Sequence, residues 1–491
     1  WKDRIFFPDN ETYFVKELMK ISNRIILASL GTPYLLMDFT EISTYLCAYK
    51  GSALMQSALY KSLTGKENIS GRLPISIPGM FDVGSGIFLE KKEEQKEKKQ
   101  FDPGKLLLRV RPKSVDADIS NIERLMDQAV NERAWPGGVL LAAKDGNIFY
   151  QRGHGYHTYD KKSPTRSSDI FDLASITKVV STTSAIMKLQ DLKKIDINKP
   201  VVKYLPEFKG SNKKYISQKS SITIKDLLAH VSGLPPFKKY YETEKTKKLL
   251  LTSIFDTDPL YENRDTTIYS DVGAIILGQI VEKVSGLTLD TFVDSMVFEP
   301  LGMSTTFFNP PSIKKHRIVP TEISSEGNLI HGYVHDENAH VLEGVAGHAG
   351  LFSTVKDIAV FSQMMLNGGL YGWKRIFKNE TVSQFTNKAN ILENSSRLLG
   401  WDSPQGKASG GIYLSDFSFG HTGFTGTSLW IDPKNKIIVV LLTNAVHPNR
   451  ESKSPNYYDW RQRIHSSVYE ALSIKEINPK LELRAKWGSI E

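Results

Sequence analysis

The sequence contains a single cysteine, Cys47, among its 491 residues. One thiol cannot form an internal disulfide, and it cannot supply a cysteine-rich metal site. Long apolar runs are also lacking: none reaches the roughly 18 residues that a membrane-spanning helix needs. The longest run, near 437–442, is typical of a buried strand. The sequence therefore predicts neither a disulfide framework nor a membrane span.

A concentrated charge of one sign and a targeting leader are lacking as well. The net charge of +9 is spread along the chain without a basic stripe interleaved with aromatic residues, so nucleic-acid binding is not expected. The chain starts at Trp1 without a signal peptide, so we expect a fragment or a processed product whose start does not reveal its compartment. Apolar and charged fractions of 40% and 24% are those of an ordinary globular protein.

A run of charged residues divides the chain. Residues 90–100 read EKKEEQKEKKQ, which offers no apolar face to bury and predicts a solvated linker. A chain of 491 residues also exceeds what one hydrophobic core usually serves. We therefore expect a first segment over 1–90, a linker over 91–112, a larger domain over 113–475 and a tail over 476–491.

The first segment predicts mixed helix and strand. Apolar spacing favours helices near 11–22 and 53–63 and buried strands near 24–30 and 44–49. The segment closes on a stretch rich in proline and glycine, 71–79, which excludes a central strand or helix there. We expect a partial αβ domain.

Three stretches of this segment carry a resemblance to a known family: Gly31-Thr-Pro-Tyr-Leu-Leu36, Ala48-Tyr49 and Asn68-Ile-Ser-Gly-Arg-Leu-Pro-Ile-Ser-Ile-Pro-Gly79. They resemble the end of the second domain of family 3 glycoside hydrolases of the β-N-acetylglucosaminidase type. The barrel domain that carries the acid and the nucleophile of that family is missing. The resemblance therefore implies ancestry or fusion, an inert remnant without glycosidase activity, and an N-terminal glycosidase barrel in a longer parent chain.

The larger domain mixes hairpins and helices without strict βαβ alternation. Ser120 and Glu123 form a capping pair ahead of an apolar stripe at helical spacing, and Asp145-Gly146 predicts a hairpin between two strands. A second hairpin is expected near 428–443, and a closing helix over 458–472 would pack back on the sheet. This order of elements favours an α+β fold.

A serine and a lysine three residues apart, Ser175 and Lys178, stand at the start of an apolar helix. Residues i and i+3 share one face of a helix, so the lysine side chain reaches the serine hydroxyl. A serine becomes a nucleophile when a neighbouring base takes its proton, and apolar neighbours would lower the pKa of the lysine. This is the mechanics of the S-x-x-K motif of penicillin-recognising serine enzymes.

The same spacing occurs three more times, at Ser211/Lys214, Ser312/Lys315 and Ser353/Lys356. Ser211 lies in a lysine-rich loop, Ser312 follows two prolines, and Ser353 precedes a capping pair that starts a helix. Only Ser175 opens a buried apolar helix. The sequence therefore predicts Ser175 as the nucleophile, with a helix-terminal serine of no catalytic role as the alternative.

Tyr269 and Asp271 directly precede the apolar helix 272–282. A tyrosine at the mouth of a helix can relay protons, and a nearby lysine cation favours its phenolate. The alternative is that Asp271 only caps the helix and Tyr269 only fills the core. Tyr261 is a rival tyrosine, but it lies in a polar stretch that no helix follows directly.

The glycine-rich turn Gly420-His-Thr-Gly-Phe-Thr-Gly426 leads into the terminal hairpin. Glycines let a backbone approach a substrate closely. A strand-edge N–H group beside the serine would form half of an oxyanion hole.

Isolated histidines are less informative. His230, beside a helix end, is expected to be structural, with a ligand or a base as the alternative. The loop Val334-His-Asp-Glu-Asn338 and nearby His348 suggest a metal only weakly, because their spacing is irregular. We expect no metal and no cofactor.

In chain order, Ser175-Ile-Thr-Lys178, Tyr269-Ser-Asp271 and His421-Thr-Gly423 resemble the class C β-lactamase and penicillin-binding-protein family of serine hydrolases. Residues 227–235 and 344–353 also look like that family, and the resemblance spans about residues 115–472. It implies a β-lactamase-like α/β/α sandwich, with an antiparallel sheet of about five strands and an all-helical region.

The resemblance also implies roles for the site residues. Ser175 would be the nucleophile, Lys178 its activator and Tyr269 the general base and acid. The N–H groups of Ser175 and Phe424 would form the oxyanion hole. His421, Thr422 and Gly423 would face the substrate.

Two positions depart from the family pattern. Asp271 stands where β-lactamases usually have asparagine, and a carboxylate there should hold Lys178 protonated and shift the proton transfer to Tyr269. His421 stands where they usually have lysine; its ordinary pKa of about 6.5 would make it a cation for a substrate carboxylate on mild acidification. Both departures resemble the esterase and D-aminopeptidase branches.

The sequence therefore predicts a serine hydrolase that forms an acyl-enzyme on a small-molecule ester or a D-amino-acid peptide. The first segment points to cell-wall material, and the family resemblance favours the periplasm or the cell envelope. A β-lactamase is the alternative within this class. A protein that is acylated once and never turns over is the alternative outside it.

Overall fold

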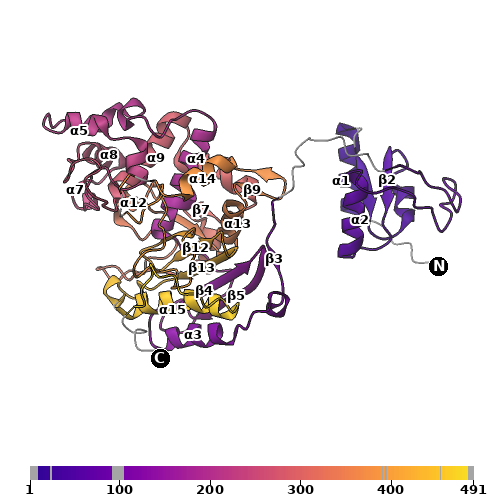
Figure 1. Cartoon of the computed structure of the whole chain (residues 1–491). Helices are drawn as coiled ribbons and strands as arrows, with labels where there is room; N and C mark the ends of the chain where they lie inside the picture. Colours follow the sequence, from indigo (N-terminus) through magenta and orange to yellow (C-terminus); the bar gives the residue numbers. More distant parts are fainter. Residues whose placement is uncertain are drawn as a thin grey trace. The chain divides into compact units, whose positions relative to one another are not determined.

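The computed structural model describes residues 9–22, 25–90, 104–389, 391–392, 395–453 and 455–484. The chain divides into two units, Trp1–Phe101 and Asp102–Glu491 (Figure 1). Most of the predicted linker, residues 91–103, lies outside the described residues.

The first unit is small and has few buried apolar side chains. Its elements are α1 (Asp9–Ile21), β1 (Ile26–Ser29), η1 (Pro33–Asp38), β2 (Thr44–Cys47) and α2 (Ala53–Leu63). The two strands pair in parallel, with Ile26 opposite Thr44. Its buried apolar residues in the described ranges are Pro33, Leu35, Leu36, Phe39, Ala48 and Ile77. The αβ content predicted for this segment is present.

The second unit is organised on a six-stranded sheet in the order β11-β12-β13-β4-β5-β3. The strands are β11 (Phe419–Thr422), β12 (Ser428–Asp432), β13 (Ile437–Thr443), β4 (Gly137–Lys144), β5 (Asn147–Gly155) and β3 (Leu108–Arg109). All neighbours are antiparallel except β3, which pairs in parallel with β5. The sheet thus has one strand more than the family resemblance implied, because Leu108–Arg109, within the predicted linker of 91–112, pairs with β5 as an edge strand.

The β4–β5 hairpin forms where Asp145-Gly146 predicted it. Asp145 and Gly146 have φ angles of 50° and 83°, the left-handed pair that a two-residue hairpin turn requires. Along β4, side chains alternate between the two faces of the sheet. Leu141 belongs to the core on one face, and Leu140 and Ala142 belong to the core on the other.

Helices cover both faces of this sheet (Figure 1). The terminal helices α3 (Ser120–Asn131) and α15 (Pro455–Ala471) pack on one face, with Trp135 and Trp460 in the core between them and the sheet. Helix α13 (Val355–Leu366) and the helical region pack on the other. The predicted α+β fold, an α/β/α sandwich, is confirmed.

The helical region is inserted between β5 and β11. Its helices are α4 (Ser184–Asp191), α5 (Ile216–Ser221), α6 (Ile224–Leu228), α7 (Tyr240–Thr243), α8 (Lys247–Phe255), α9 (Asp271–Ser285), α10 (Leu289–Val293), α11 (Glu299–Leu301), α12 (Glu337–Val341) and α14 (Asn379–Thr386). A small antiparallel sheet joins β6 (Phe171–Asp172), β8 (Leu351–Ser353) and β7 (Phe307–Phe308), and β9 (Leu370–Tyr371) pairs with β10 (Lys374–Arg375).

In the part of the chain that the structure describes, no single helix is both long and apolar enough to cross a membrane. One pair, Asp271–Ser285 with Leu289–Leu301, passes that test only when counted together across a 74° bend.

We expect that a chain starting at Asp102 folds, whereas a chain starting at Lys113 is less stable. The later start removes β3 and four backbone hydrogen bonds to other segments. Leu108 N–H donates to Gly146 O at 2.8 Å, Val110 N–H donates to Ile148 O at 3.0 Å, and Gly104 and Gly372 exchange two bonds of 2.8 and 3.0 Å. At about 1 kcal/mol for each hydrogen bond, the free energy of unfolding should fall by about 4 kcal/mol. Urea unfolding of both chains measures the difference, and insolubility of the Asp102 chain would show that the second unit needs the first.

Candidate active site

Ser175 lies on a tight turn directly after β6. Ala174, the residue before it, has a φ of +47°, a conformation that L residues rarely adopt. The Asp172 carboxylate supports this turn by accepting a hydrogen bond from Ala174 N–H at 2.8 Å. The turn leaves Ser175 partly exposed, while Ala174 and Ile176 on either side of it are buried.

The helix that follows Ser175 is irregular. Residues Ala174–Ile176 form a 3₁₀ turn, Lys178–Thr183 form a π-helical segment, and the α-helix proper, α4, begins only at Ser184. The apolar spacing thus predicts the helix but not its first two turns. Short π-helical segments occur frequently at functional sites.

Lys178 is buried, with 4% of its side chain exposed, and its ammonium makes two hydrogen bonds and one ion pair. The Nζ atom lies 2.9 Å from Ser175 Oγ, 2.7 Å from Asp271 Oδ1 and 3.0 Å from the carbonyl oxygen of His348. Burial by itself lowers the pKa of Lys178, but Asp271 and then Tyr269 raise it above its usual value. The pKa decrease expected from the apolar neighbours is therefore wrong, and the protonation expected from Asp271 is correct.

Asp271 is the first residue of α9, but it does not cap that helix. Ser270 is the cap: its hydroxyl accepts from Gly273 N–H at 3.1 Å and donates to Pro235 O at 2.7 Å. The Asp271 carboxylate therefore remains available for Lys178. The alternative that Asp271 only caps the helix is wrong.

Tyr269 lies against the same lysine. Its ring centroid is 4.9 Å from Lys178 Nζ, and its hydroxyl is buried and has no hydrogen-bond partner among the residues that the structure describes. Burial raises the pKa of Tyr269, and the opposing attraction of Lys178 does not cancel this effect. The resting side chain is therefore a phenol, not the phenolate that the lysine was expected to favour.

Two buried histidines flank Tyr269. The ring of His230 lies 4.9 Å from the tyrosine ring and accepts a hydrogen bond from Ser270 N–H at 3.1 Å. The ring of His421 lies 5.8 Å away on another side. Burial lowers the pKa of His230 well below its ordinary value, so this histidine is a neutral neighbour of the site.

His421 stays neutral far below pH 6. Its Nδ1 atom pairs with Thr422 O at 2.8 Å, and its buried Nε2 atom has no partner in the described ranges. Burial lowers the pKa of His421 to about 4, and Asp402 opposes that decrease only in part. The expected cation at mildly acidic pH is therefore wrong, because His421 is enclosed and not solvated.

Arg397 is the cation that sequence reasoning missed. Its guanidinium lies 4.9 Å from the centre of the Tyr269 ring, and the side chain, 18% exposed, forms an ion pair with Asp402. A backbone bridge joins Asp402 to Gly420 on β11, which brings this pair beside His421. No local motif surrounds Arg397, so only the fold reveals it.

The glycine-rich turn lies against the Ser175 turn. A Cβ atom on Gly423 would come within 2.1 Å of Thr427 Oγ1 and 2.3 Å of Leu173 O, so only glycine fits there. Thr427 donates a hydrogen bond to Leu173 O at 2.9 Å, and Thr425 donates to Asp172 O at 2.8 Å. Phe424 follows with 48% of its surface exposed.

The structure thus brings the predicted site residues into one cluster: Ser175, Lys178, Tyr269 and Asp271, with His421, Thr422, Gly423 and Phe424 on the adjoining turn. The rival serines lie elsewhere: Ser211 donates to Asp256, Ser353 pairs with Thr306, and Ser312 starts a 3₁₀ turn after Pro311. Tyr261 is 47% exposed, and its carbonyl accepts from Gln218.

Comparison with known proteins finds relatives of the second unit. The Beta-lactamase family model matches residues 122–463. A Salmonella typhi protein with the provisional name D-alanyl-D-alanine carboxypeptidase is 37% identical over 371 residues, which cover 68% of this chain and 85% of that protein.

Two solved structures show the same fold. The octameric penicillin-binding protein homologue from Pyrococcus abyssi is 22% identical, with a TM-score of 0.54 over 70% of this chain and 81% of that one. EstCE1, a hydrolase with promiscuous acyltransferase activity, is 20% identical, with a TM-score of 0.58 over 73% and 99%.

A fluorophosphonate probe should label Ser175 covalently, and Ser175→Ala should abolish the labelling. Ser175 is the serine whose hydroxyl lies beside a lysine at the site. Mass spectrometry of the intact chain and of its peptides locates the adduct. Ser211→Ala, Ser312→Ala and Ser353→Ala are the controls and should label normally. An adduct on any serine other than Ser175 would contradict the assignment.

Tyr269→Phe should lower the rate of that labelling, or of substrate turnover, by about 10²–10⁴-fold, the usual contribution of a positioned acid or base. The substitution removes only the buried hydroxyl and keeps the ring against Lys178. Tyr261→Phe is the matched control and should react at the normal rate. A larger loss at Tyr261 would exclude Tyr269 as the proton-transfer group.

Proposed function

The chain belongs to the β-lactamase family and is a serine hydrolase, and we propose that it removes the terminal residue from peptides that end in a D-amino acid. In this role it is a D-alanyl-D-alanine type carboxypeptidase that works through an acyl-enzyme on Ser175. The observation that carries the proposal is the cluster of Ser175, Lys178, Asp271 and Tyr269 beside a fixed arginine.

The protonation states of the cluster suggest how the first step proceeds. Lys178 is protonated at rest, so it accepts the Ser175 proton only as it passes one to Asp271, 2.7 Å away. Ser175 Oγ then bonds to the carbonyl carbon, and N–H groups of Ser175 and Phe424 stabilise the oxyanion. Tyr269 donates its phenolic proton to the leaving amine, which departs as the C–N bond breaks.

The second step uses the groups that the first step leaves behind. Tyr269 is now a phenolate, and the charge of Lys178 stabilises it. It takes a proton from a water molecule, which attacks the acyl carbon. As the ester bond breaks, Lys178 returns a proton to Ser175 Oγ and Asp271 gives its proton back to Lys178. Each group ends in its starting state.

Arg397 supports a substrate that ends in a carboxylate. A guanidinium stays charged at any pH at which the protein is folded, and it can pair with a carboxylate through two N–H groups. It lies beside the Tyr269 ring, near the predicted position of the leaving group. His421 cannot play this part, because the pKa of about 4 keeps it neutral.

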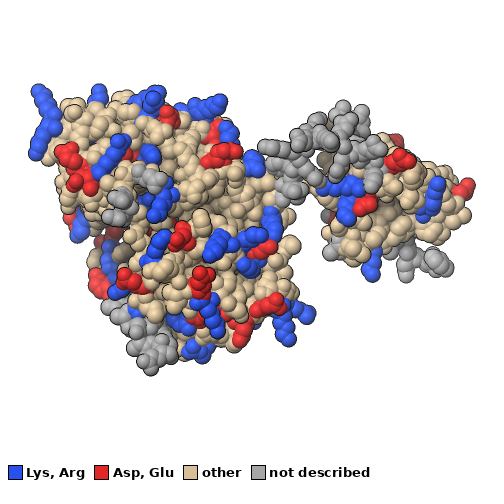
Figure 2. Space-filling view, in the orientation of Figure 1, with Lys and Arg blue, Asp and Glu red and all other residues tan. Residues whose placement is uncertain are grey.

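The wider context favours a small-molecule or peptide substrate over nucleic acid. Lys and Arg side chains are interspersed with Asp and Glu over the face of the second unit shown in Figure 2, and form no continuous basic stripe on that face. The resemblance of residues 1–90 to family 3 glycoside hydrolases supports cell-wall material as the source of the substrate. For that first unit we propose a remnant of such a domain, which cleaves no N-acetylglucosaminide.

The direct test offers the enzyme four compounds: a peptide ending in D-alanyl-D-alanine, the same peptide with a C-terminal amide, a neutral 4-nitrophenyl ester and a penicillin. We expect release of D-alanine from the free peptide and loss of that activity in Ser175→Ala. Fastest turnover of the ester or of the penicillin would favour an esterase or a β-lactamase. A burst without steady turnover would indicate a protein that is acylated once.

Arg397→Ala should lower kcat/KM for the carboxylate peptide by about 10- to 100-fold, the loss of one hydrogen bond to a charged group. The neutral ester should change by less than about three-fold, well below the worth of such a bond. The ratio between the two substrates should also be the same at pH 7 and pH 6, because His421 does not titrate in that range.

Arg463→Ala is the matched control. Arg463 is 17% exposed and pairs with Glu470 at 2.7 Å, but it lies on α15 on the other face of the sheet. It should leave both substrates unaffected. An equal loss on peptide and ester in Arg397→Ala would show that Arg397 supports the fold of the site and does not recognise the carboxylate.

A further inference from the structure

Three consecutive polar residues, His335, Asp336 and Glu337, lie next to the site but carry no part of the chemistry described above. They stand at the start of α12, in the loop whose histidine and carboxylates first suggested a metal. Each side chain instead bonds to another protein group. His335 pairs with Glu322 at 2.8 Å, Asp336 with His348 at 2.8 Å and Glu337 with Arg450 at 2.7 Å.

Asp336 connects to Lys178 through His348. One carboxylate oxygen of Asp336 accepts from Ala339 N–H at 2.7 Å and is 2.8 Å from His348 Nε2. Burial alone would raise the pKa of Asp336, but the adjacent His348 lowers it well below its usual range, so the side chain stays a carboxylate. The carbonyl oxygen of His348 is the atom that accepts from Lys178 Nζ at 3.0 Å.

His335 connects the same segment to the Ser175 turn. Its backbone N–H donates to one oxygen of Asp172 at 2.8 Å, and the other oxygen accepts from Ala174 N–H at 2.8 Å. Asp172 is fully buried, and these two N–H groups satisfy the oxygens of its carboxylate. One segment thus reaches both the turn that presents Ser175 and the carbonyl that holds Lys178.

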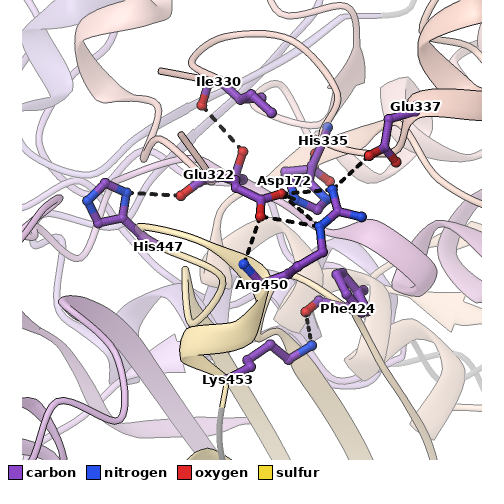
Figure 3. A network of polar contacts seen from close by, with 10 residues as sticks. Asp172, Glu322, Ile330, His335, Glu337, Phe424, His447, Arg450 and Lys453 are labelled. Atoms are coloured by element: carbon purple, nitrogen blue, oxygen red, sulfur yellow. Dashed lines mark hydrogen bonds and ion pairs between the residues drawn. The ribbon is translucent and has the colours of Figure 1, made fainter. Parts of the chain in front are cut away.

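The segment is itself anchored at both ends, as Figure 3 shows. Glu322 holds the His335 ring, and Arg450 binds Glu322 through Nη2 at 2.8 Å and Glu337 through the same nitrogen at 2.7 Å. His335 also stacks on Phe424, with ring centroids 5.8 Å apart. The position of residues 335–337 is therefore fixed relative to the glycine-rich turn as well.

We propose that Asp336 is a positioning residue. Through His348 it fixes the carbonyl oxygen that accepts from Lys178. The neighbouring His335 supports the Ser175 turn, so the segment holds the lysine and the serine in place relative to each other. This inference rests on the proposed function of Ser175 and Lys178. The other two acceptors of the Lys178 ammonium, Ser175 Oγ and Asp271, lie on separate elements. If the His348 carbonyl moves, the ammonium turns away from the serine. A misplacement of about 1 Å at a catalytic group can cost about 10²-fold in rate.

The test measures covalent labelling of Ser175 by a fluorophosphonate, as the maximal rate of inactivation and the probe concentration at half that rate. Asp336→Ala should lower the maximal rate by about 10- to 100-fold and leave the half-saturating concentration within about two-fold, because probe binding does not involve Lys178. Asp336→Asn should restore most of the rate, since an amide oxygen also accepts from Ala339 and His348 and asparagine caps helices well.

His348→Ala gives an independent measurement should Asp336→Ala fail to fold. It keeps the carbonyl that contacts Lys178 and removes only the tie to Asp336, so it should show the same loss of maximal rate. A normal rate in either alanine variant would overturn the proposal. An Asp336→Asn variant as slow as Asp336→Ala would also overturn it, because the hydrogen bonds would then not be what matters.

Asp169→Ala is the matched control. Asp169 forms a second buried His–Asp pair, with His157 Nε2 at 2.8 Å, but neither residue bonds to Lys178 or to its acceptors in the described chain. It should lower the melting temperature and leave the labelling rate unchanged. An equal loss of rate in Asp169→Ala would mean that Asp336→Ala acts only by general destabilisation. Labelling at another serine in wild type would instead defeat the proposed function itself, so the two failures are distinct.

Discussion

The site depends on the buried ion pair between Lys178 and Asp271. Removing two charges from water is costly, and their attraction repays that cost only when the geometry is close and the remaining protons and lone pairs are satisfied. Here the two charged groups are 2.7 Å apart, and the Lys178 ammonium also donates hydrogen bonds to Ser175 Oγ and to the His348 carbonyl oxygen. This arrangement explains why Ser270 caps α9, since a capping role for Asp271 would leave the lysine without its counter-charge.

The ion pair also fixes how distant parts of the chain meet. Lys178 comes from the turn after β6, Asp271 from the start of α9, and His348 from the loop before β8. Gly347 packs against the backbone of α9: a Cβ atom on Gly347 would come within 2.1 Å of Ala274 O and 3.1 Å of Gly278 N. Helix α9 and the loop that carries His348 are therefore in direct backbone contact, so Asp271 and His348 approach Lys178 from adjoining segments.

The fold could be predicted from the sequence where the signal is local. The Asp145-Gly146 turn, the α3 stripe after Ser120 and the hairpin near 428–443 each depend on neighbouring residues, and all three are present. The edge strand β3 was missed because Leu108–Arg109 forms a strand only through pairing with β5. Two residues carry no pattern that would predict a strand on their own.

The site was less predictable, because its properties depend on contacts between segments that are far apart in the sequence. The S-x-x-K spacing selected the serine and lysine that the structure places together, but the pKa direction of Lys178 depends on a carboxylate on another helix. Arg397 gave no sequence signal, because the backbone bridge between Asp402 and Gly420 is what brings it beside the site. The enclosure of His421, which sets its pKa, is likewise a property of packing between segments.

The π-helical segment Lys178–Thr183 limits how this site can change in evolution. A π turn holds one residue more than an α turn, so it rotates whatever precedes it by about 100° relative to an uninterrupted helix. Val179 and Val180 of this segment lie in the same core as Ala185 and Ile186 of α4. Loss of a single residue from the segment would therefore turn Lys178 away from its carboxylate and shift these two valines at the same time, so the reacting groups and the core on this face can change only together.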